Sequence, residues 1–392
     1  MRTYRVALLG CRSRGTAAGR SYHLHPRCEV VGLCDLMPER LNALGDELNV
    51  SARFTDLDEM MARTKPDIVA IPTATEFHYE LCLRVLDYGV HIDVEKPMCA
   101  TLEQADHVLR VARSKGVRIA VHHQGRCSPA MNAVKQTLRS GRIGELRYLT
   151  GTGKGYYGGY GLMNIGTHLV NNLLGLAGPC RSVTALALTD GSLVSPDDVL
   201  PSAGGMGTVC GERISALLHF DHNVIGSLTQ HRYPVVDETA YGIEVFGTEG
   251  RLIWKQTNAW LLPTPHFVPD GVHDRWEALP MVYPDTFDPD GKADITEYTY
   301  VDEFVQALDE GREHECSGVE GRHVMEVLTG VLEASAYGKR VSLPQEDRRH
   351  PLLRWREERG MGPLAARPRE YNEWLAAEDR RLGRFEPVPV AK

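Results

Sequence analysis

The stretch RVALLGCRSRG, residues 5–15, decides how the first part of this chain folds. Its apolar run up to Leu9 is typical of a buried parallel strand, and the turn from Gly10 to Gly15 follows it and opens a helix. At such a junction, backbone N–H groups can donate hydrogen bonds to a pyrophosphate, and the positive end of the helix dipole attracts it. Arg12 departs from the Gly-x-Gly-x-x-Gly pattern, because a side chain there should hinder close approach of the backbone, although an arginine can itself contact phosphate. Taken alone, the hexapeptide also fits an ordinary strand-to-helix turn.

Around this turn, the first 125 residues alternate short β-branched runs with helical patterns, which predicts a doubly wound parallel sheet. The expected strands are 5–9, 29–34, 67–71, 90–94 and 117–122, and the expected helices are 39–48, 76–88 and 102–114. Thr101 is placed to cap the last of these helices.

After Ser128-Pro129 the pattern changes, and a second domain of α+β class is expected. Strand alternation between about Ser182 and Leu262 predicts a largely antiparallel open sheet. A loop at 263–294, helices at 298–310 and 319–337, and a tail helix near 370–381 should follow. We therefore expect a dinucleotide-binding domain at 1–125, a substrate-binding and oligomerisation domain at 126–344, and a charged extension at 345–392.

Composition excludes several classes of partner. Of the 392 residues, 42% are apolar and 24% are charged, and the formal net charge of −8 without a long basic block argues against nucleic acid. No uncharged apolar stretch reaches the roughly 18 residues that span a bilayer, and the N-terminus does not resemble a signal peptide. The nine cysteines contain no Cys-x-x-Cys pair, which indicates reduced thiols and no metal. A cytoplasmic protein without membrane or nucleic-acid partners is expected.

The end of the second predicted strand favours NAD as the cofactor. Asp35 lies about twenty residues after Gly15, where a carboxylate can bond the ribose hydroxyls of NAD and would repel a 2′-phosphate. Asp35 could instead only cap the helix that begins near Pro38. The predicted contacts of the dinucleotide also include Ser13 and Arg14 in the turn, Thr73 beside the nicotinamide ribose, and His78, Glu95 and Lys96. The first domain is thus expected to be an NAD-binding Rossmann domain.

Glu95-Lys96-Pro97 is the point at which the sequence resembles the Gfo/Idh/MocA family of oxidoreductases, which includes glucose-fructose oxidoreductases and inositol dehydrogenases. The order of features agrees over most of the chain up to about Pro344. Further segments carry the resemblance: Pro72 with Thr73 and His78, Arg126-Cys127-Ser128-Pro129, Asn164 to Asn171, Phe246 to Gly250, and Gly338 to Val341.

The resemblance implies roles for two side chains. Lys96, at the carboxyl end of a parallel strand beside the nicotinamide, would draw off the proton of the substrate hydroxyl as hydride leaves. Glu95 would orient it, and the Lys96-Pro97 peptide would be cis. His168 matches the family's catalytic histidine and would relay the proton. Lys96 could instead belong to an ordinary surface turn, and His168 could instead be a packed structural residue.

Two positions depart from the family pattern, which commonly has aspartates where this chain has Asn164 and Asn171. Asn164 is expected one helical turn before His168, and an amide there cannot stabilise an imidazolium by charge. His168 should therefore be a weaker base, and Lys96 should carry more of the proton transfer. Alternatively, the amide accommodates a different arrangement of hydroxyls.

The Gly- and Tyr-rich segment 151–161 precedes that helix and is expected to form the substrate wall. Tyr156, Tyr157 and Tyr160 offer flat apolar faces with hydroxyls, which suit pyranose rings, and Arg126 is a further substrate candidate. Packing of these tyrosines within the second domain is the equal alternative. A metal site at His122, His123 and His168 is disfavoured, because adjacent residues of a strand point to opposite faces.

These residues predict reversible oxidation of a secondary hydroxyl of a sugar, sugar derivative or cyclic polyol by NAD, with proton transfer through Lys96 and His168. The alternatives are a redox-neutral enzyme that recycles its NAD, such as an epimerase or lyase, and a non-catalytic NAD-binding regulator. A homodimer or homotetramer assembled through the antiparallel sheet is also expected, because an open sheet face must be covered.

Overall fold

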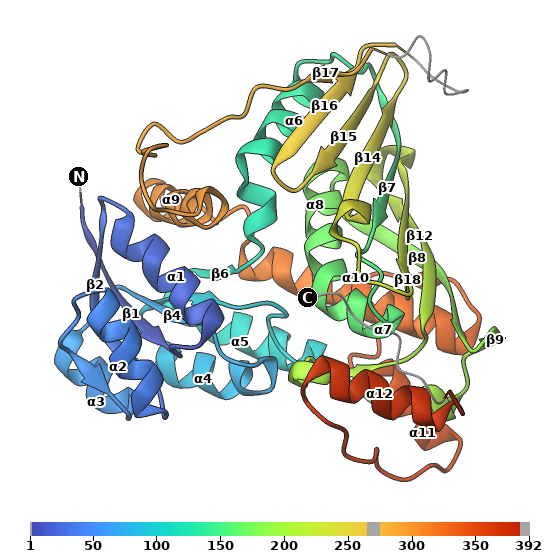
Figure 1. Cartoon of the computed structure of the whole chain (residues 1–392), viewed down its shortest axis with the longest axis horizontal. Coiled ribbons are helices and arrows are strands. Elements are labelled where there is room, and N and C mark those ends of the chain that lie inside the picture. The colour runs from blue at the N-terminus through green and yellow to red at the C-terminus, as the bar shows by residue number, and fades with distance from the viewer. Residues whose placement is uncertain (1, 265–274, 385–392) are drawn as a thin grey trace. The chain divides into compact units, whose positions relative to one another are not determined.

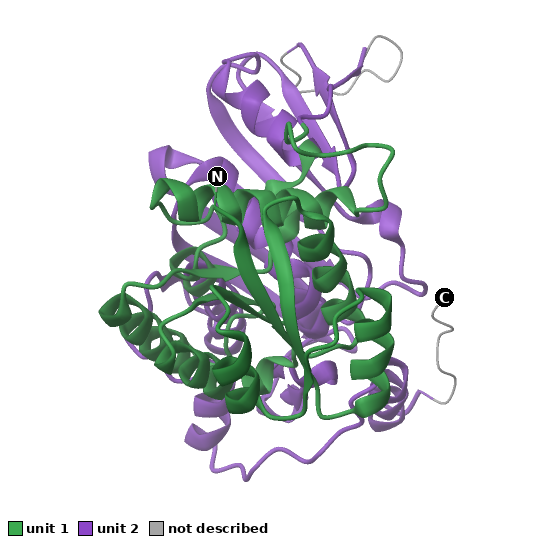
Figure 2. Ribbon diagram, turned by 90° about the vertical axis from the view of Figure 1, so that its left-hand side faces the viewer, with its two compact units in different colours: residues 1–129, 283–322 green, residues 130–282, 323–392 purple. Residues whose placement is uncertain are grey.

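The computed structural model describes residues 2–264 and 275–384. They form two compact units, which Figure 2 colours separately: Met1–Pro129 with Tyr283–Arg322, and Ala130–Val282 with His323–Lys392. The change of unit after Pro129 lies close to the predicted boundary. The return of a later segment to the first unit was not predicted.

The first unit is built on a six-stranded parallel sheet in the order β3-β2-β1-β4-β5-β6. Its strands are β1 Tyr4–Leu9, β2 Cys28–Cys34, β3 Arg53–Phe54, β4 Ile68–Ile71, β5 His91–Val94 and β6 Ile119–Val121. Its helices are α1 Ser13–Leu24, α2 Pro38–Glu47, α3 Leu57–Thr64, α4 Thr75–Asp87, α5 Leu102–Lys115 and α9 Ile295–Glu310. This order reverses direction between β1 and β4, the place where doubly wound sheets bind nucleotides.

Local sequence explains where these helices begin and end. Thr101 caps α5 as expected, since its hydroxyl accepts the N–H of Gln104, and Gly116 ends the helix in the left-handed conformation that glycine tolerates. Tyr300 and Phe304 of α9 are fully buried in the same core as the side chains of β1 and β2. Because α9 supplies part of this core, 283–322 belongs to the dinucleotide-binding unit.

The second unit carries a ten-stranded sheet in the order β17-β16-β15-β14-β7-β13-β12-β8-β18, with β9 paired to β8 (Figure 1). Every pairing is antiparallel except that of β7 with β13, as the predicted open sheet required. The strands are β7 Leu146–Thr152, β8 Cys180–Thr189, β9 Ser192–Leu193, β12 Arg213–Phe220, β13 Ile225–His231, β14 Gly242–Gly247, β15 Arg251–Lys255, β16 Asn258–Leu262, β17 Glu277–Ala278 and β18 Val341–Ser342. A separate pair joins β10 Leu200–Pro201 to β11 Thr208–Val209.

Helices of the second unit pack on this sheet and bring the C-terminal residues into its core. They are α6 Pro129–Arg139, α7 Gly158–Gly161, α8 Thr167–Ala177, α10 Gly318–Tyr337, α11 Pro351–Glu358 and α12 Tyr371–Arg381, with α10 beginning in the first unit. Trp355 of α11 and Trp374 of α12 are buried in the same hydrophobic cluster as Leu169 of α8. The expected C-terminal extension therefore packs into the core of the second unit.

Most of the predicted elements are confirmed to within a few residues. The elements β3, α3, β17 and α11 were missed, and β17 lies within the predicted loop. Part of the predicted loop at 263–294 lies outside the described residues. Among the described residues, no helix is both long enough and apolar enough to cross a membrane.

Candidate active site

Four predicted motifs lie at one edge of the parallel sheet. Gly10 directly follows β1, Asp35 follows β2, Pro72 with Thr73 follows β4, and Glu95 with Lys96 follows β5. These strands are neighbours in the order β2-β1-β4-β5, so their carboxyl ends bring the motifs together.

The turn after β1 has the close packing that a dinucleotide requires. Gly10 has φ +120°, which side chains rarely adopt, and a Cβ on Gly15 would lie 2.1 Å from the carbonyl oxygen of Gly10. Arg12 is exposed in extended conformation and provides no side-chain cap, and the first turn of α1 contains no acidic residue. The start of α1 therefore suits a pyrophosphate, with Arg12 and Ser13 at its rim.

Asp35 joins the two turns on which a dinucleotide would rest. Its Oδ2 accepts the N–H of Cys11 at 2.7 Å, and its Oδ1 accepts the N–H of Met37 at 2.8 Å. Each carboxylate oxygen has a second lone pair, so Asp35 can also accept a ribose hydroxyl. Asp35 does not cap α2, whose N-cap residue is Met37 and which has no side-chain cap.

The turn after β4 is tied to the Lys96 turn through His78. The ring nitrogens of His78 lie 2.9 Å from the carbonyl oxygen of Pro97 and 3.1 Å from that of Thr73. His78 is fully buried, so it shapes the site from beneath, which corrects its assignment as a direct cofactor contact. The buried hydroxyl oxygen of Thr73 has no hydrogen-bond partner within the described part of the chain, as expected of a group that meets a cofactor.

Lys96 lies just beyond β5 on a cis peptide bond to Pro97, as the resemblance implies. Burial lowers the pKa of Lys96 to about 8; Glu95 opposes this shift, whereas Arg14 adds to it. Glu95 is itself buried and accepts the backbone N–H of Lys96 at 3.1 Å. A lysine with this pKa can both release and accept a proton near neutral pH.

Arg14, which was expected to contact the cofactor, pairs with two carboxylates in the structure. Its guanidinium pairs with Glu95 and, at 3.0 Å, with Glu297 of α9. Glu297 also accepts from His122 at 2.8 Å, and the other ring nitrogen of His122 lies 3.1 Å from Asp93. We call Arg14, Glu95, Glu297, His122 and Asp93 the Glu297 cluster. The cluster reaches Lys96 through Glu95.

The charges in the Glu297 cluster are set by mutual pairing. Burial alone would lower the pKa of His122, but Asp93 and Glu297 raise it to about 10. Burial alone would raise the pKa of Glu297, but His122 and Arg14 lower it to about 2. His122 is therefore an imidazolium and Glu297 a carboxylate at neutral pH. Sequence reasoning did not find Glu297, because it lies 175 positions after His122.

In the second unit, the predicted substrate residues form a row. Tyr156, Tyr160, Asn164 and His168 recur every four residues and are all partly exposed. The Nδ2 of Asn164 donates to the hydroxyl of Tyr160 at 3.1 Å. The turn Leu162–Gly166 is a π-helix, so the expected α-helical spacing before His168 is interrupted; such turns often occur at functional sites.

Two further substrate candidates have other roles in the structure. Tyr157 is fully buried, and its ring meets that of Trp374 edge-on with centroids 5.0 Å apart, which corrects the expectation that it contacts substrate. Arg126 is mostly buried and pairs with Glu320 at 2.7 Å, so its charge is compensated within the first unit.

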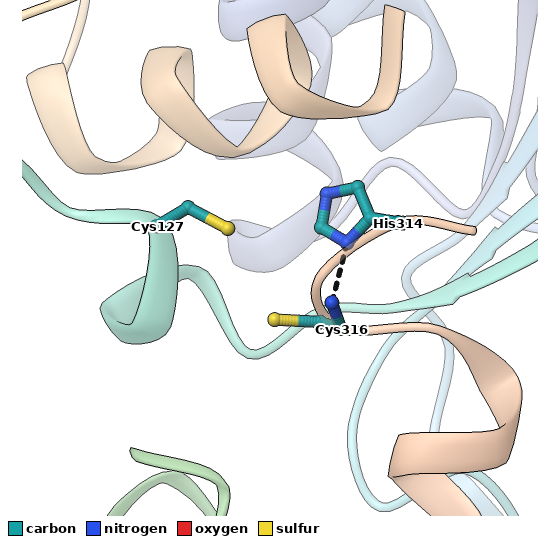
Figure 3. A group of neighbouring side chains, drawn as sticks. All are labelled: Cys127, His314 and Cys316. Atoms are coloured by element: carbon teal, nitrogen blue, oxygen red, sulfur yellow. Dashed lines mark hydrogen bonds between the residues drawn. The ribbon is translucent and has the colours of Figure 1, made fainter. Parts of the chain in front are cut away.

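A cluster of soft ligands lies in the first unit. The donor atoms of Cys127, His314 and Cys316 all lie within 4.8 Å of one another, and the three side chains are buried (Figure 3). The Nδ1 of His314 accepts the N–H of Cys316 at 2.8 Å, and its Nε2 lies 3.2 Å from the carbonyl oxygen of Tyr300. Because both ring nitrogens have partners, a metal ion would have to displace one of them.

The strand order, the turn after β1 and the lysine after β5 define an NAD-binding oxidoreductase with a second, antiparallel domain. Residues 4–123 match the NAD-binding Rossmann fold of the Gfo/Idh/MocA oxidoreductases, and residues 135–343 match the C-terminal alpha/beta domain of the same family. The chain belongs to the Gfo/Idh/MocA family.

Relatives of known activity include sugar dehydrogenases. The chain is 28% identical over 182 residues to D-glucoside 3-dehydrogenase of Escherichia coli (strain K12), covering 43% of this chain and 52% of the relative. It is 32% identical over 151 residues to D-apiose dehydrogenase of Paraburkholderia graminis, covering 37% and 38%. The matches thus span about half or less of these curated relatives.

The fold is shared with solved structures. Levoglucosan dehydrogenase in complex with NADH and levoglucosan superposes with a TM-score of 0.70 at 18% identity, covering 88% of this chain and 100% of that chain. At this identity the likeness shows the fold alone.

Proposed function

We propose that the protein oxidises or reduces a secondary hydroxyl of a sugar or cyclic polyol with NAD, and that Lys96 is its proton-transfer group. The observation that carries the proposal is the position of Lys96 at the carboxyl end of β5 with a pKa of about 8. The sugar dehydrogenases among the relatives support this substrate class.

The cofactor and the residues of the site have different roles in the proposed reaction. NAD, when bound, accepts or returns the hydride. Neutral Lys96 accepts the proton of the substrate hydroxyl, and Glu95 fixes the backbone from which Lys96 projects. His168 is proposed to relay the proton. Because Asn164 donates to the hydroxyl of Tyr160 and has no charge to offer, Lys96 should carry the larger share.

Removal of the Lys96 amine tests the proposal directly. We expect Lys96→Ala to lower kcat for sugar oxidation by roughly 10²- to 10⁴-fold, which is typical of losing a general base. NADH formation on a panel of neutral sugars is the measurement, with Lys115→Ala as the control because Lys115 pairs with Asp87 on the surface. Unchanged turnover in Lys96→Ala would overturn the assignment, and turnover without NADH formation would indicate a redox-neutral reaction.

The pKa of Lys96 gives the direction of the pH dependence. Oxidation needs the neutral amine, so kcat/KM should rise with pH through about 8 and then level off. Reduction needs the ammonium form of Lys96, so kcat/KM for reduction should fall as the pH rises through about 8. The measurement is kcat/KM against pH with NAD and with NADH. A flat profile in both directions would show that Lys96 does not transfer the proton.

Selectivity for NAD over NADP is proposed to rest on Asp35. Asp35→Ser should weaken binding of NAD and strengthen that of NADP, because the carboxylate repels a 2′-phosphate. Dissociation constants for both dinucleotides, measured by fluorescence titration, give the ratio. Wild-type protein that binds NADP as tightly as NAD would contradict this role.

Assembly through the open sheet is proposed as well. Leu186 of β8, Leu193 of β9 and Leu217 of β12 are 52%, 65% and 56% exposed, respectively. Apolar side chains gathered on one sheet face favour burial against a second copy. Light scattering should show a dimer or tetramer that Leu217→Lys weakens, and a wild-type monomer at micromolar concentration would contradict the proposal.

A further inference from the structure

The row of partly exposed residues before α8 is completed by a tyrosine from the C-terminal tail. Tyr371, the first residue of α12, places its ring 4.4 Å from that of Tyr160 and 5.2 Å from that of Tyr156, measured between centroids. Tyr156 and Tyr160 are themselves 5.4 Å apart. Three partly exposed rings thus meet at one place, which we call the tyrosine triad, and Figure 1 shows α12 beside α7.

The triad is continuous with the polar residues of the row. The hydroxyl of Tyr160 accepts from Asn164 at 3.1 Å, and His168 follows four residues later. The hydroxyl of Tyr371 accepts the backbone N–H of Tyr157 at 3.0 Å, so its own O–H can donate to a ligand oxygen. Burial raises the pKa of Tyr371 to about 12, which keeps this donor protonated.

The tail holds Tyr371 firmly in place. The Glu370 side chain caps α12 by accepting two backbone N–H groups, and the indole N–H of Trp374 donates to the carbonyl of Pro201 at 2.8 Å. Asp379 forms a two-pronged pair with Arg232 at 2.6 and 2.8 Å and is almost fully buried. A ring fixed in this way loses little freedom on binding a ligand, so it is preorganised.

The tyrosine from the tail lies outside the part of the chain that matches the family's C-terminal domain. The family match ends at residue 343, and α12 lies beyond it. Tyr371 therefore lies outside the residues that match the family's C-terminal domain. Flat aromatic faces with a hydroxyl at the rim suit the C–H faces and hydroxyls of a neutral pyranose.

We propose that Tyr371 is a specificity-determining residue, which with Tyr160 and Asn164 forms a subsite for a neutral pyranose ring. This inference rests on the proposed sugar oxidoreductase activity and assigns the tail a part in choosing its substrate. Tyr371 holds the ring and does not take part in proton transfer. Its loss should therefore raise KM for the sugar with little change in kcat or in the affinity for NAD.

The test uses the full chain and steady-state kinetics with NAD, on D-glucose and its methyl pyranosides. Tyr371→Leu should raise KM about 10-fold, the effect of losing a well-packed aromatic contact of ~1.4 kcal/mol. Tyr371→Phe keeps the ring and loses the O–H, so its KM should rise about threefold. The control is Tyr337→Leu, which removes a tyrosine that packs on Trp355 of α11, away from the triad.

Each outcome decides the inference. A raised KM in Tyr371→Leu with unchanged kcat and NAD affinity, and wild-type values in Tyr337→Leu, supports the subsite. Wild-type KM in both Tyr371 variants, or equal losses in kcat and NAD affinity, overturns it. If Tyr371→Leu does not fold, Tyr371→Phe decides by the same criteria. If wild-type protein turns over none of these sugars while Lys96→Ala abolishes activity on another substrate, the pyranose subsite alone fails; if Lys96→Ala changes nothing, the proposed function fails.

Discussion

Glu297 in the first unit and Glu212 in the second are both buried and pair with two cationic side chains, and the two sites differ in what those cations are. In the first unit, Glu297 accepts from Arg14 and His122. In the second unit, Glu212 accepts from Arg232 and from Arg384. Pairing holds the pKa of both carboxyl groups at about 2, although burial opposes this in each case.

The difference lies in what each glutamate connects. Glu297 connects α9 to the turn after β1 and, through Arg14 and Glu95, to the lysine of the proposed site. Glu212 connects the sheet to the C-terminal tail, where Arg384 lies just beyond α12. A buried, paired glutamate thus lies next to the proposed site in one unit and holds the C-terminal tail in the other.

The largest expected effect comes from neutralising Glu297. Glu297→Gln leaves a buried imidazolium and the 38% exposed guanidinium of Arg14 short of negative charge. We expect a loss of ~3 kcal/mol in the free energy of unfolding, at the low end for a broken buried pair because solvent screens Arg14. Glu212→Gln should cost about the same. Only Glu297→Gln should also lower turnover, because only its partners reach Lys96. Urea unfolding and NADH formation measure both effects.

Glu29→Gln is the matched control for these substitutions. Glu29 is 62% exposed and lies 3.8 Å from Arg5, so the change should cost less than about 1 kcal/mol. If Glu212→Gln lowered turnover as much as Glu297→Gln, the division of roles between the two glutamates would be wrong.

The contrast between the units also shows what could be predicted from the sequence. Gly10, Asp35 and Lys96 were found because each follows a strand whose pattern is local, and parallel strands bring their carboxyl ends to one edge. The cofactor class followed from the same residues. These features need only short-range patterns and the geometry of one sheet.

The remaining features depend on contacts between distant parts of the chain. Glu297 and Tyr371 complete their clusters from helices with no motif of their own, and nothing in their local sequence indicates a partner. The sequence left open whether Tyr157 contacts substrate or packs inside the second domain, because Trp374, which covers it, lies in the tail. The side chain of Arg14 was assigned to phosphate because the sequence did not reveal its two carboxylate partners.

A second prediction separates the two clusters by pH. The lowered pKa of both glutamates means that the stability each contributes is present above about pH 4.5 and is lost as pH falls toward about 2. The raised pKa of His122 means that its contribution is complete below about pH 6.5 and is lost as pH rises toward about 10. Of the two clusters, only the Glu297 cluster contains a histidine, so only this cluster should lose stability for this reason as the pH rises.

His122→Gln should remove this loss of stability at high pH. It should also reduce the loss at acid pH in the first unit, because His122 helps to lower the pKa of Glu297, and leave that of the Glu212 site in place. The measurement is the unfolding midpoint in urea between pH 4 and pH 10, with the variant compared to wild type at each pH. The gap between the two proteins should be widest near pH 6 and close as pH rises toward about 10. A constant gap over this range would show that His122 is not held as an imidazolium.

The smallest expected effect concerns the outer edge of the Glu212 site. Arg384 is 33% exposed, so solvent weakens its attraction to Glu212, and Arg232 remains to compensate the charge. We expect Arg384→Ser to cost about 1 kcal/mol in the free energy of unfolding, and to leave turnover of the proposed reaction unchanged. A matched change in the first unit, Arg14→Ser, removes the cation between Glu95 and Glu297 and should reduce turnover as well. If both arginine variants lost only stability, the ionic connection from Glu297 to Lys96 would be structural alone, and the two units would use their buried glutamates in the same way.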